Sequence, residues 1–187
     1  MSEEYFNNRI LLCDDNRSIH ADLLKILKPR ELKADSDILR DMESRIFDME
    51  DADLISPPNP YSLDLEIDHA YSGGEAMEKV RCANEEGRPY ALVFMDVRMP
   101  PGPDGVKTIK DIWELLPQTE VVIVTAYSDY SWNEVVEKLG ANDKLLYLRK
   151  PVSTITVRQI ALNLTHKWNS AAKLRQRLQE LESKTER

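Results

Sequence analysis

The sequence is poor in the residues that build disulfide frameworks and zinc sites. It holds two cysteines and three histidines in 187 residues, and Cys13 and Cys82 lie far apart, at no spacing typical of a metal site. This scarcity argues against a disulfide-rich secreted domain and against a zinc-stabilised module, and it fits a reducing compartment. We expect both cysteines to be buried as small apolar side chains.

Long apolar runs are also missing. No run approaches the roughly 18 residues that a membrane-spanning helix needs, and the polar start, MSEEYFNNRI, does not resemble a secretory signal. We therefore expect a cytoplasmic protein without a membrane segment. A hydrophobic fraction of 42% and a charged fraction of 31% are ordinary for a globular domain.

Positive charge is scarce over most of the chain. The formal net charge is −8, and the segment from Glu31 to Ile55 holds nine acidic and three basic residues. Only the end, from Leu164 to Arg187, is basic, with six basic and three acidic residues. Nucleic-acid binding needs a basic surface, so we expect no nucleic-acid partner.

Short apolar runs alternate with helical patterns along the chain. The five runs are RILLCD (9–14), LEIDHA (65–70), YALVFMD (90–96), EVVIVTA (120–126) and KLLYL (144–148). Near-continuous Val, Ile and Leu are typical of strands buried on both faces. Between the runs, Ser72 with Glu75, Asp104, and Ser131 with Glu134 are helix-capping patterns. The alternation predicts an α/β domain with a five-stranded, doubly wound parallel sheet.

Two segments are not accounted for by a five-stranded sheet with its connecting helices. Residues 29–64 form an insertion after the first helix, in which the pattern predicts one further helix before the breaker run SPPNP. The second segment is a long helix that begins near Thr154, with a 166–187 extension beyond the domain. Its apolar positions fall on one heptad register that Lys167 interrupts: Val157, Ile160, Leu164, Ala171, Leu174, Leu178 and Leu181. We expect its first turns to pack on the sheet and the rest, beyond about Trp168, to form a coiled coil or a signalling helix rather than a frayed tail.

Polar residues follow the predicted strands at their carboxyl ends. Asp14 and Asp15 follow the first strand, Asp96 the third, Thr125 ends the fourth, and Lys150 follows the fifth. In a parallel sheet these ends converge at one edge. Carboxylates held together raise one another's pKa unless a cation lies among them, and an all-oxygen cluster suits Mg²⁺. The sequence therefore predicts a small magnesium site beside a lysine and a hydroxyl.

These residues resemble the receiver domain of bacterial two-component response regulators. Asp14-Asp15, Asp96 in MDVRMP, Thr125-Ala126 and Lys150-Pro151 match the family's motif in order and spacing over about residues 8–165, without the insertion. The phrases MDVRMPPGPDG and VTAYSDYSW resemble a subgroup found in hybrid or multidomain signalling proteins. The resemblance implies a flavodoxin-like sheet of strand order 2-1-3-4-5 and a cis peptide bond before Pro151.

The resemblance also implies a role for each site residue. Asp96 would be the phosphoacceptor, with Lys150 and Thr125 on the phosphoryl oxygens. Mg²⁺ would be held by Asp14, Asp15, Asp96 and the backbone carbonyl of Arg98. Thr125 and Tyr147 would form the switch. The side chains of Arg98 and Tyr127 would modulate the lifetime of the phosphoryl group.

The resemblance implies a histidine kinase or a histidine phosphotransfer protein as partner. The heptad pattern of the C-terminal helix indicates a homodimer as a further hypothesis. The chain contains no recognisable output domain, so we expect an output partner outside it and no catalysis beyond its own phosphoryl transfer and dephosphorylation. One alternative is an interaction module that keeps the fold but is not phosphorylated. Another is an aspartate-nucleophile phosphohydrolase, but those enzymes typically place a second aspartate where Arg98 stands, and Arg98 cannot act as acid or base.

Overall fold

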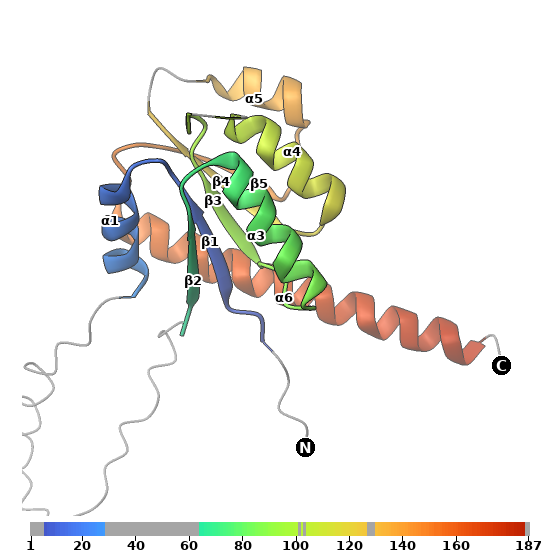
Figure 1. The fold of residues 1–187 in the computed structure, drawn as a ribbon. Coiled ribbons are helices and arrows are strands. Elements are labelled where there is room, and N and C mark those ends of the chain that lie inside the picture. Colours follow the sequence, from blue (N-terminus) through green and yellow to red (C-terminus); the bar gives the residue numbers. More distant parts are fainter. Residues whose placement is uncertain (1–5, 29–63, 101, 103, 127–129, 186–187) are drawn as a thin grey trace, which may run out of the picture.

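The computed structural model describes residues 6–28, 64–100, 102, 104–126 and 130–185 (Figure 1). Its strands form one parallel sheet in the order β2-β1-β3-β4-β5, which confirms the predicted doubly wound fold. The strands are β1 (Arg9–Cys13), β2 (Glu66–Ala70), β3 (Leu92–Met95), β4 (Glu120–Thr125) and β5 (Leu145–Arg149). The described helices are α1 (Arg17–Leu27), α3 (Gly73–Glu85), α4 (Gly105–Leu115), α5 (Trp132–Leu139) and α6 (Thr154–Thr185).

The helices cover the sheet in two layers. Helices α1 and α6 pack on one face, and α3, α4 and α5 pack on the other (Figure 1). Side chains along a strand point alternately to the two faces. Leu11 and Val93 therefore join the core under α3 and α4, whereas Ile10 and Leu12 join the core under α1 and α6. The central strands β1, β3 and β4 are buried along their whole length, as their apolar sequences predict.

The capping residues start the helices where the sequence places them. The Asp104 side chain accepts a hydrogen bond from the Lys107 backbone N–H, 2.8 Å away. Ser131 and Glu134 form a full capping box at the start of α5. At α3, Ser72 accepts from Glu75 N, but the Glu75 carboxylate accepts from the backbone of Tyr71, so only half of that box forms.

The two cysteines differ in environment. Cys13 is buried in β1, as expected, and burial raises the pKa of its thiol. Cys82 is exposed, so the expectation that both are buried is wrong. The buried stripe of α3 runs through Ala76, Val80 and Ala83, and Cys82 lies on the solvent side of it.

Helix α6 has an inner half on the sheet and an outer half that projects from it (Figure 1). Val157, Ala161, Leu164 and Trp168 are buried, whereas every side chain from 173 to 184 is exposed. Buried contacts thus continue a few residues past 165. Lys167, which interrupts the heptad pattern, reaches Glu120 at 3.2 Å and Asp143 at 3.1 Å.

The chain before β1 holds α6 at the point where the helix leaves the sheet. The Asn7 backbone N–H donates to Asn169 Oδ1 at 2.7 Å, and Asn169 Nδ2 donates back to the Asn7 carbonyl at 2.8 Å. The Phe6 ring contacts the His166 ring in a tilted arrangement, with ring centroids 5.0 Å apart. These contacts tie the start of the chain to the middle of α6.

The predicted insertion lies almost entirely outside the described residues, and so does its predicted helix. Its two stems are described. Helix α1 runs back from the carboxyl edge of the sheet and ends at Leu27, and β2 begins at Glu66, so both stems lie at the amino edge (Figure 1). The Asn8 side-chain amide donates to the Asp64 carbonyl and fixes the second stem beside β1.

Candidate functional site

Three carboxylates meet at the carboxyl edge of the sheet. Asp14, Asp15 and Asp96 each offer an oxygen, and these oxygens all lie within 4.8 Å of one another. Asp14 and Asp96 are 4% and 8% exposed, whereas Asp15 is open to solvent. The strand ends bring the three together, since β1 and β3 are neighbours in register from Ile10–Leu92 to Cys13–Met95.

Lys150, which directly follows the outer strand β5, reaches this cluster with its side chain. Its Nζ donates to Asp14 Oδ2 at 2.7 Å and to Asp96 Oδ2 at 2.8 Å. The peptide bond that follows it, Lys150–Pro151, is cis, as the resemblance implies. One ammonium group therefore bridges two buried carboxylates that are 82 residues apart in the sequence.

Burial and neighbouring groups shift the pKa values of Asp96 and Lys150. Burial raises the pKa of Asp96; the hydrogen bond from Lys150 opposes this and the nearby Asp14 adds to it. Burial alone would lower the pKa of Lys150, but the hydrogen bonds to Asp14 and Asp96 outweigh it and raise that pKa. Lys150 is therefore positively charged, but its single charge does not balance the negative charge of the carboxylates.

The backbone around Asp96 is fixed on both sides. Its amide donates to the Cys13 carbonyl at 2.8 Å, and its Oδ1 accepts from the Val97 amide at 2.6 Å. Helix α4 begins directly against it, because the Gly105 amide donates to the Val97 carbonyl at 2.8 Å. A Cβ at position 105 would lie 2.0 Å from the Asp96 carbonyl oxygen, so this approach requires glycine.

Asp14 is held by contacts that the sequence patterns did not predict. The buried His20 lies with Nε2 2.7 Å from the Asp14 carbonyl, and its Nδ1 lies 2.8 Å from Nδ1 of His69. The Tyr71 ring packs on His20, with centroids 4.6 Å apart. Desolvation lowers the pKa of His69, and the neighbouring His20 lowers it further. Through His20 and His69, α1 and β2 thus hold the Asp14 backbone in place.

The cluster suits a small divalent cation. Its donors are oxygens from three carboxylates, two of them nearly buried, which is the hard, anionic set that Mg²⁺ prefers. Asp14, Asp15 and Asp96 would hold such an ion. The Arg98 carbonyl stays a prediction as a fourth ligand; Arg98 itself is exposed, two residues after Asp96.

The two predicted switch residues lie on neighbouring strands. Thr125 is fully buried at the end of β4, and its carbonyl accepts from the Lys150 amide at 2.9 Å. Tyr147, on β5 beside Ile123, is half-buried and donates its hydroxyl to the Tyr130 carbonyl. Its ring meets Trp132 edge-on, with centroids 6.2 Å apart. Tyr127, predicted to modulate phosphoryl lifetime, lies outside the described residues.

Tyr130 connects β5 to Asp104, in the loop that follows Asp96. The sequence patterns did not predict this connection. Its hydroxyl donates to Asp104 Oδ2 at 3.1 Å and accepts from Lys138 Nζ at 3.0 Å. The ammonium group of Lys138 also lies 4.4 Å from the centre of the ring. The N-cap of α4, the start of α5 and β5 are therefore joined through one residue.

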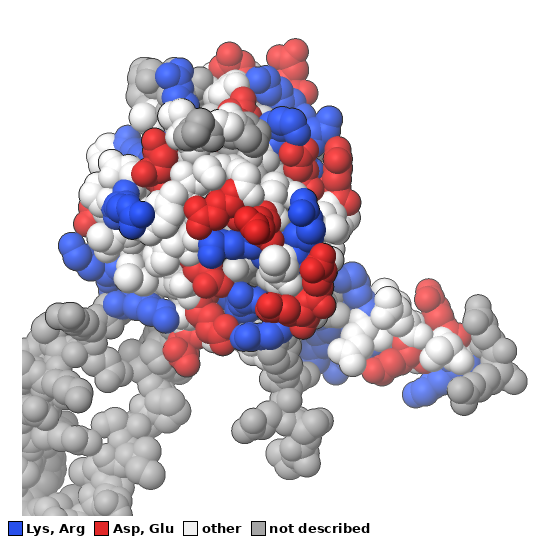
Figure 2. All heavy atoms as spheres, viewed as in Figure 1, with Lys and Arg blue, Asp and Glu red and all other residues white. Residues whose placement is uncertain are grey.

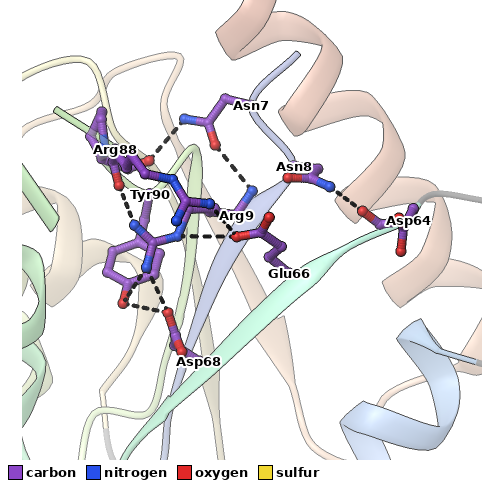
Figure 3. A network of polar contacts seen from close by, with 9 residues as sticks. Asn7, Asn8, Arg9, Asp64, Glu66, Asp68, Arg88 and Tyr90 are labelled. Carbon is purple, nitrogen blue, oxygen red and sulfur yellow. Dashed lines mark hydrogen bonds and ion pairs between the residues drawn. The ribbon is translucent and has the colours of Figure 1, made fainter. Parts of the chain in front are cut away.

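A second charged cluster occupies the opposite, amino edge of the sheet (Figure 3). Arg9, 9% exposed, donates to Asp68 at 2.8 Å, and its guanidinium lies 4.6 Å from the centre of the Tyr90 ring. Tyr90 also donates to Asp68 at 2.7 Å, and Arg88 pairs with Glu66 at 2.7 Å. The hydrogen bonds from Tyr90 and Arg9 lower the pKa of Asp68, outweighing its partial desolvation.

Comparison with known families decides which kind of domain this is. The model of the response regulator receiver domain matches residues 61–161, which include Asp96, Thr125 and Lys150. The chain belongs to the receiver domain family. The match begins at residue 61, near the end of the predicted insertion, so Asp14 and Asp15 lie before it, and it is the geometry that brings them to the same site.

Curated relatives are similar to less than half of this chain. The oxygen regulatory protein NreC of Staphylococcus haemolyticus is 38% identical over 77 residues, which cover 41% of this chain and 33% of the relative. The transcriptional regulatory protein ZraR of Escherichia coli O157:H7 is 42% identical over 83 residues, which cover 44% of this chain and 17% of the relative. The aligned part thus spans a third or less of these relatives.

Solved structures share the fold. A CheY-like receiver domain protein from Methanospirillum hungatei has a TM-score of 0.57 at 19% identity, and the match covers 88% of this chain and 98% of that one. An adenylate cyclase structure from Rhodopirellula baltica has a TM-score of 0.63 at 19% identity, with 92% and 98% covered. Among the described helices of this receiver, none combines the length and the apolar character needed to cross a membrane.

Proposed function

We propose that this receiver is a phosphoacceptor of a two-component phosphorelay and that Asp96 carries the phosphoryl group. The observation that carries the proposal is the set of hydrogen bonds that Lys150 makes to Asp14 and Asp96 within the three-carboxylate cluster. A buried carboxylate that is fixed by backbone on both sides, with a cation in contact, has the position required of a nucleophile.

The reaction forms one bond and breaks another. An Asp96 carboxylate oxygen attacks phosphorus in line, an acyl phosphate forms, and the bond from phosphorus to the donor breaks. The donor keeps the electron pair; it is a histidine nitrogen of a kinase or phosphotransfer protein, or the acetate of acetyl phosphate. Asp14, Asp15 and Asp96 would hold Mg²⁺, which when bound would neutralise charge on the transferring group.

The residues of the chain have separate tasks in this step. Lys150 moves from Asp96 to a phosphoryl oxygen while keeping its contact with Asp14, and the Thr125 hydroxyl donates to another oxygen. Bulk at Arg98 and Tyr127 shields the acyl phosphate from water and slows its hydrolysis. The chain catalyses only its own phosphorylation and dephosphorylation.

Switching uses the β4 and β5 side of the domain. A phosphoryl group draws Thr125 toward it and opens space into which the Tyr147 ring turns. That turn breaks the hydrogen bond from Tyr147 to Tyr130 and the ring contact with Trp132, so α5 is released from β5. Partners that contact this face would respond to the change. These partners are a second copy of the chain, bound through α6, and an output protein in the cytoplasm.

Intact-mass measurement with acetyl phosphate and magnesium tests the proposal. We expect one phosphate adduct in the wild type and none in Asp96→Asn. Asp22→Asn is the matched control, because Asp22 is an exposed carboxylate of α1, with 66% of its side chain accessible; it should form the adduct normally. Removal of magnesium with EDTA should suppress the adduct in the wild type. An adduct that survives in Asp96→Asn, or a folded wild type that never forms one, contradicts the proposal.

A further inference from the structure

The buried imidazole of His20 contacts the backbone of a candidate metal ligand. His20 is 4% exposed, and its Nε2 lies 2.7 Å from the Asp14 carbonyl oxygen. A carbonyl oxygen only accepts hydrogen bonds, so Nε2 carries the hydrogen and donates it. In the neutral imidazole, Nδ1 is then an acceptor that requires a donor of its own.

His69, on β2, supplies that donor. Its Nδ1 lies 2.8 Å from Nδ1 of His20, and the two rings meet edge-on with centroids 4.9 Å apart. The two imidazoles thus form a directed series of hydrogen bonds, from His69 Nδ1–H to His20 Nδ1 and from His20 Nε2–H to the Asp14 carbonyl. His69 therefore fixes the tautomer of His20 that can donate to Asp14.

Aromatic packing holds the His20 ring in one orientation. The Tyr71 ring lies against it with centroids 4.6 Å apart, and the Arg17 guanidinium lies 4.5 Å from the centre of the Tyr71 ring. The backbone of Tyr71 is itself fixed, because its amide donates to the Glu75 carboxylate at 2.9 Å. The hydrogen bond from His20 to the backbone is therefore set before any ligand binds.

The Asp14 carbonyl belongs to the peptide bond that leads to Asp15. A peptide unit is planar, so a hydrogen bond to its oxygen fixes how the whole unit is turned and helps to set where the Asp15 side chain points. The other polar atoms of Asp14 are also bonded: its amide donates to the Ala70 carbonyl, Oδ1 accepts from the Asn16 amide and Oδ2 accepts from Lys150. Because Asp15 is open to solvent, packing constrains it little, and the backbone has the larger part in aiming its carboxylate.

We propose that His20, oriented by His69, is a positioning residue for the divalent cation. By holding the Asp14 carbonyl, it keeps the three carboxylate oxygens within 4.8 Å of one another. His20 acts through the backbone and not as a ligand, because both of its ring nitrogens are engaged in hydrogen bonds. The proposal rests on the proposed function, since it concerns the cation that phosphoryl transfer would use, but cation binding is measured apart from that transfer.

Two variants at His20 separate hydrogen bonding from packing. His20→Phe keeps an aromatic ring against Tyr71 but removes the donor, whereas His20→Gln removes the ring and places an amide donor at about the distance of Nε2. A positioning role predicts that His20→Gln binds the cation normally and His20→Phe does not, and a packing role predicts the reverse order. His166→Phe is the matched control, since His166 is exposed on α6 and its ring contacts Phe6.

Mn²⁺ binding, followed by electron paramagnetic resonance, is the first readout, because Mn²⁺ takes the same oxygen ligands as Mg²⁺. Acidic side chains are spread over the surface in Figure 2, and the net charge is −8, so Asp15→Asn serves to measure binding outside the complete cluster. Above that background, His20→Phe should raise the dissociation constant about tenfold, while His20→Gln and His166→Phe stay close to the wild type. Equal binding by the two His20 variants, or a wild type that binds no more than Asp15→Asn, overturns the proposal.

The phosphate adduct gives a second, separate readout. At low Mg²⁺ concentration His20→Phe should form the adduct more slowly than the wild type, and saturating Mg²⁺ should restore the rate, because only the affinity for the cation is reduced. A rate that stays low at saturating Mg²⁺ overturns the positioning role. A wild type that binds Mn²⁺ but forms no adduct contradicts the phosphoacceptor proposal and leaves the role of His20 in place.

Variants at His69 and spectroscopy of the wild type carry the test if His20→Phe does not fold. His69→Leu removes the donor to His20, whereas His69→Asn keeps one at the position of Nδ1. We expect His69→Leu to weaken Mn²⁺ binding and His69→Asn to leave it unchanged; equal binding by both overturns the part assigned to His69. Long-range ¹H–¹⁵N spectra of the wild type near neutral pH should show His20 protonated at Nε2 and His69 at Nδ1. A hydrogen on Nδ1 of His20 in place of Nε2 overturns the whole assignment.

Discussion

The two edges of the sheet each hold a cluster of charged side chains, and they differ in how the charge is balanced. At the amino edge, Arg9 and Arg88 face Glu66 and Asp68. Two cations meet two carboxylates, and the hydroxyl of Tyr90 completes the contacts of Asp68. This cluster joins β1, β2 and the segment before β3, and its charges satisfy one another.

At the carboxyl edge the charge is left unbalanced. Lys150 pairs with Asp14 and Asp96, which are nearly buried, and Asp15 adds a third carboxylate to the cluster. The pKa of Asp96 is raised there, whereas that of Asp68 at the other edge is lowered. Burial that leaves charge uncompensated costs stability, and such sites are typical of function. The amino-edge cluster therefore stabilises the fold, whereas the carboxyl-edge cluster keeps an excess of negative charge that the proposed Mg²⁺ would neutralise.

The largest expected effect is the loss of the buried cation at the amino edge. Arg9→Met leaves Asp68 and Glu66 without their shared partner and should lower the free energy of unfolding by about 2–3 kcal/mol, since the carboxylates keep part of their hydration. Urea denaturation followed by circular dichroism measures it. Arg88→Met, at a half-exposed position, is the matched control and should cost about 0.5 kcal/mol. Equal losses for the two variants would remove the distinction between buried and exposed members of this cluster.

A smaller effect of opposite sign is expected at the carboxyl edge. Because the folded pKa of Asp96 is raised, the wild type loses stability as pH rises from below the ordinary value of 3.8 through the folded pKa. At neutral pH and without magnesium, Asp96→Asn should therefore be more stable by about 1 kcal/mol. Added magnesium should stabilise the wild type more than the variant and reduce the difference. A destabilised variant without magnesium would contradict the unbalanced charge.

The smallest effect concerns the pH dependence at the amino edge. The lowered pKa of Asp68 means that its contribution is present above the unfolded value of 3.8 and is lost as pH falls through the lower folded value. Asp68→Asn should cost about 1 kcal/mol or less near neutral pH, because 41% of the side chain is exposed and water screens the pair. The difference between wild type and variant should shrink below the unfolded value. A difference that grows in acid would be inconsistent with this assignment.

Local sequence patterns predicted most of the elements of the fold. Continuous apolar runs located the buried strands, and Asp104 and Ser131 located helix starts, because both signals depend on neighbours in the sequence. The carboxyl-edge cluster was also predictable, since parallel strands bring their ends together whatever the rest of the chain does.

The remaining contacts could not be read from such patterns. Arg9 looks like an ordinary first residue of a strand, yet its partners Asp68 and Tyr90 are 59 and 81 residues away. His20 sits on an amphipathic helix with no mark that its imidazole meets the Asp14 backbone. Tyr130 lies in the VTAYSDYSW motif, but its hydrogen bond to Asp104 depends on how two loops approach each other. Contacts between distant segments follow from packing, which periodicity does not encode.

The placement of the insertion stems has a practical consequence. Leu27 and Glu66 both lie at the amino edge, whereas Asp96 and Lys150 lie at the opposite edge, with the full length of the strands between them. A fluorescent reporter or an affinity tag inserted in place of residues 29–63 would therefore join the domain at the amino edge. It would be separated by the length of the strands from the site of the proposed phosphoryl transfer.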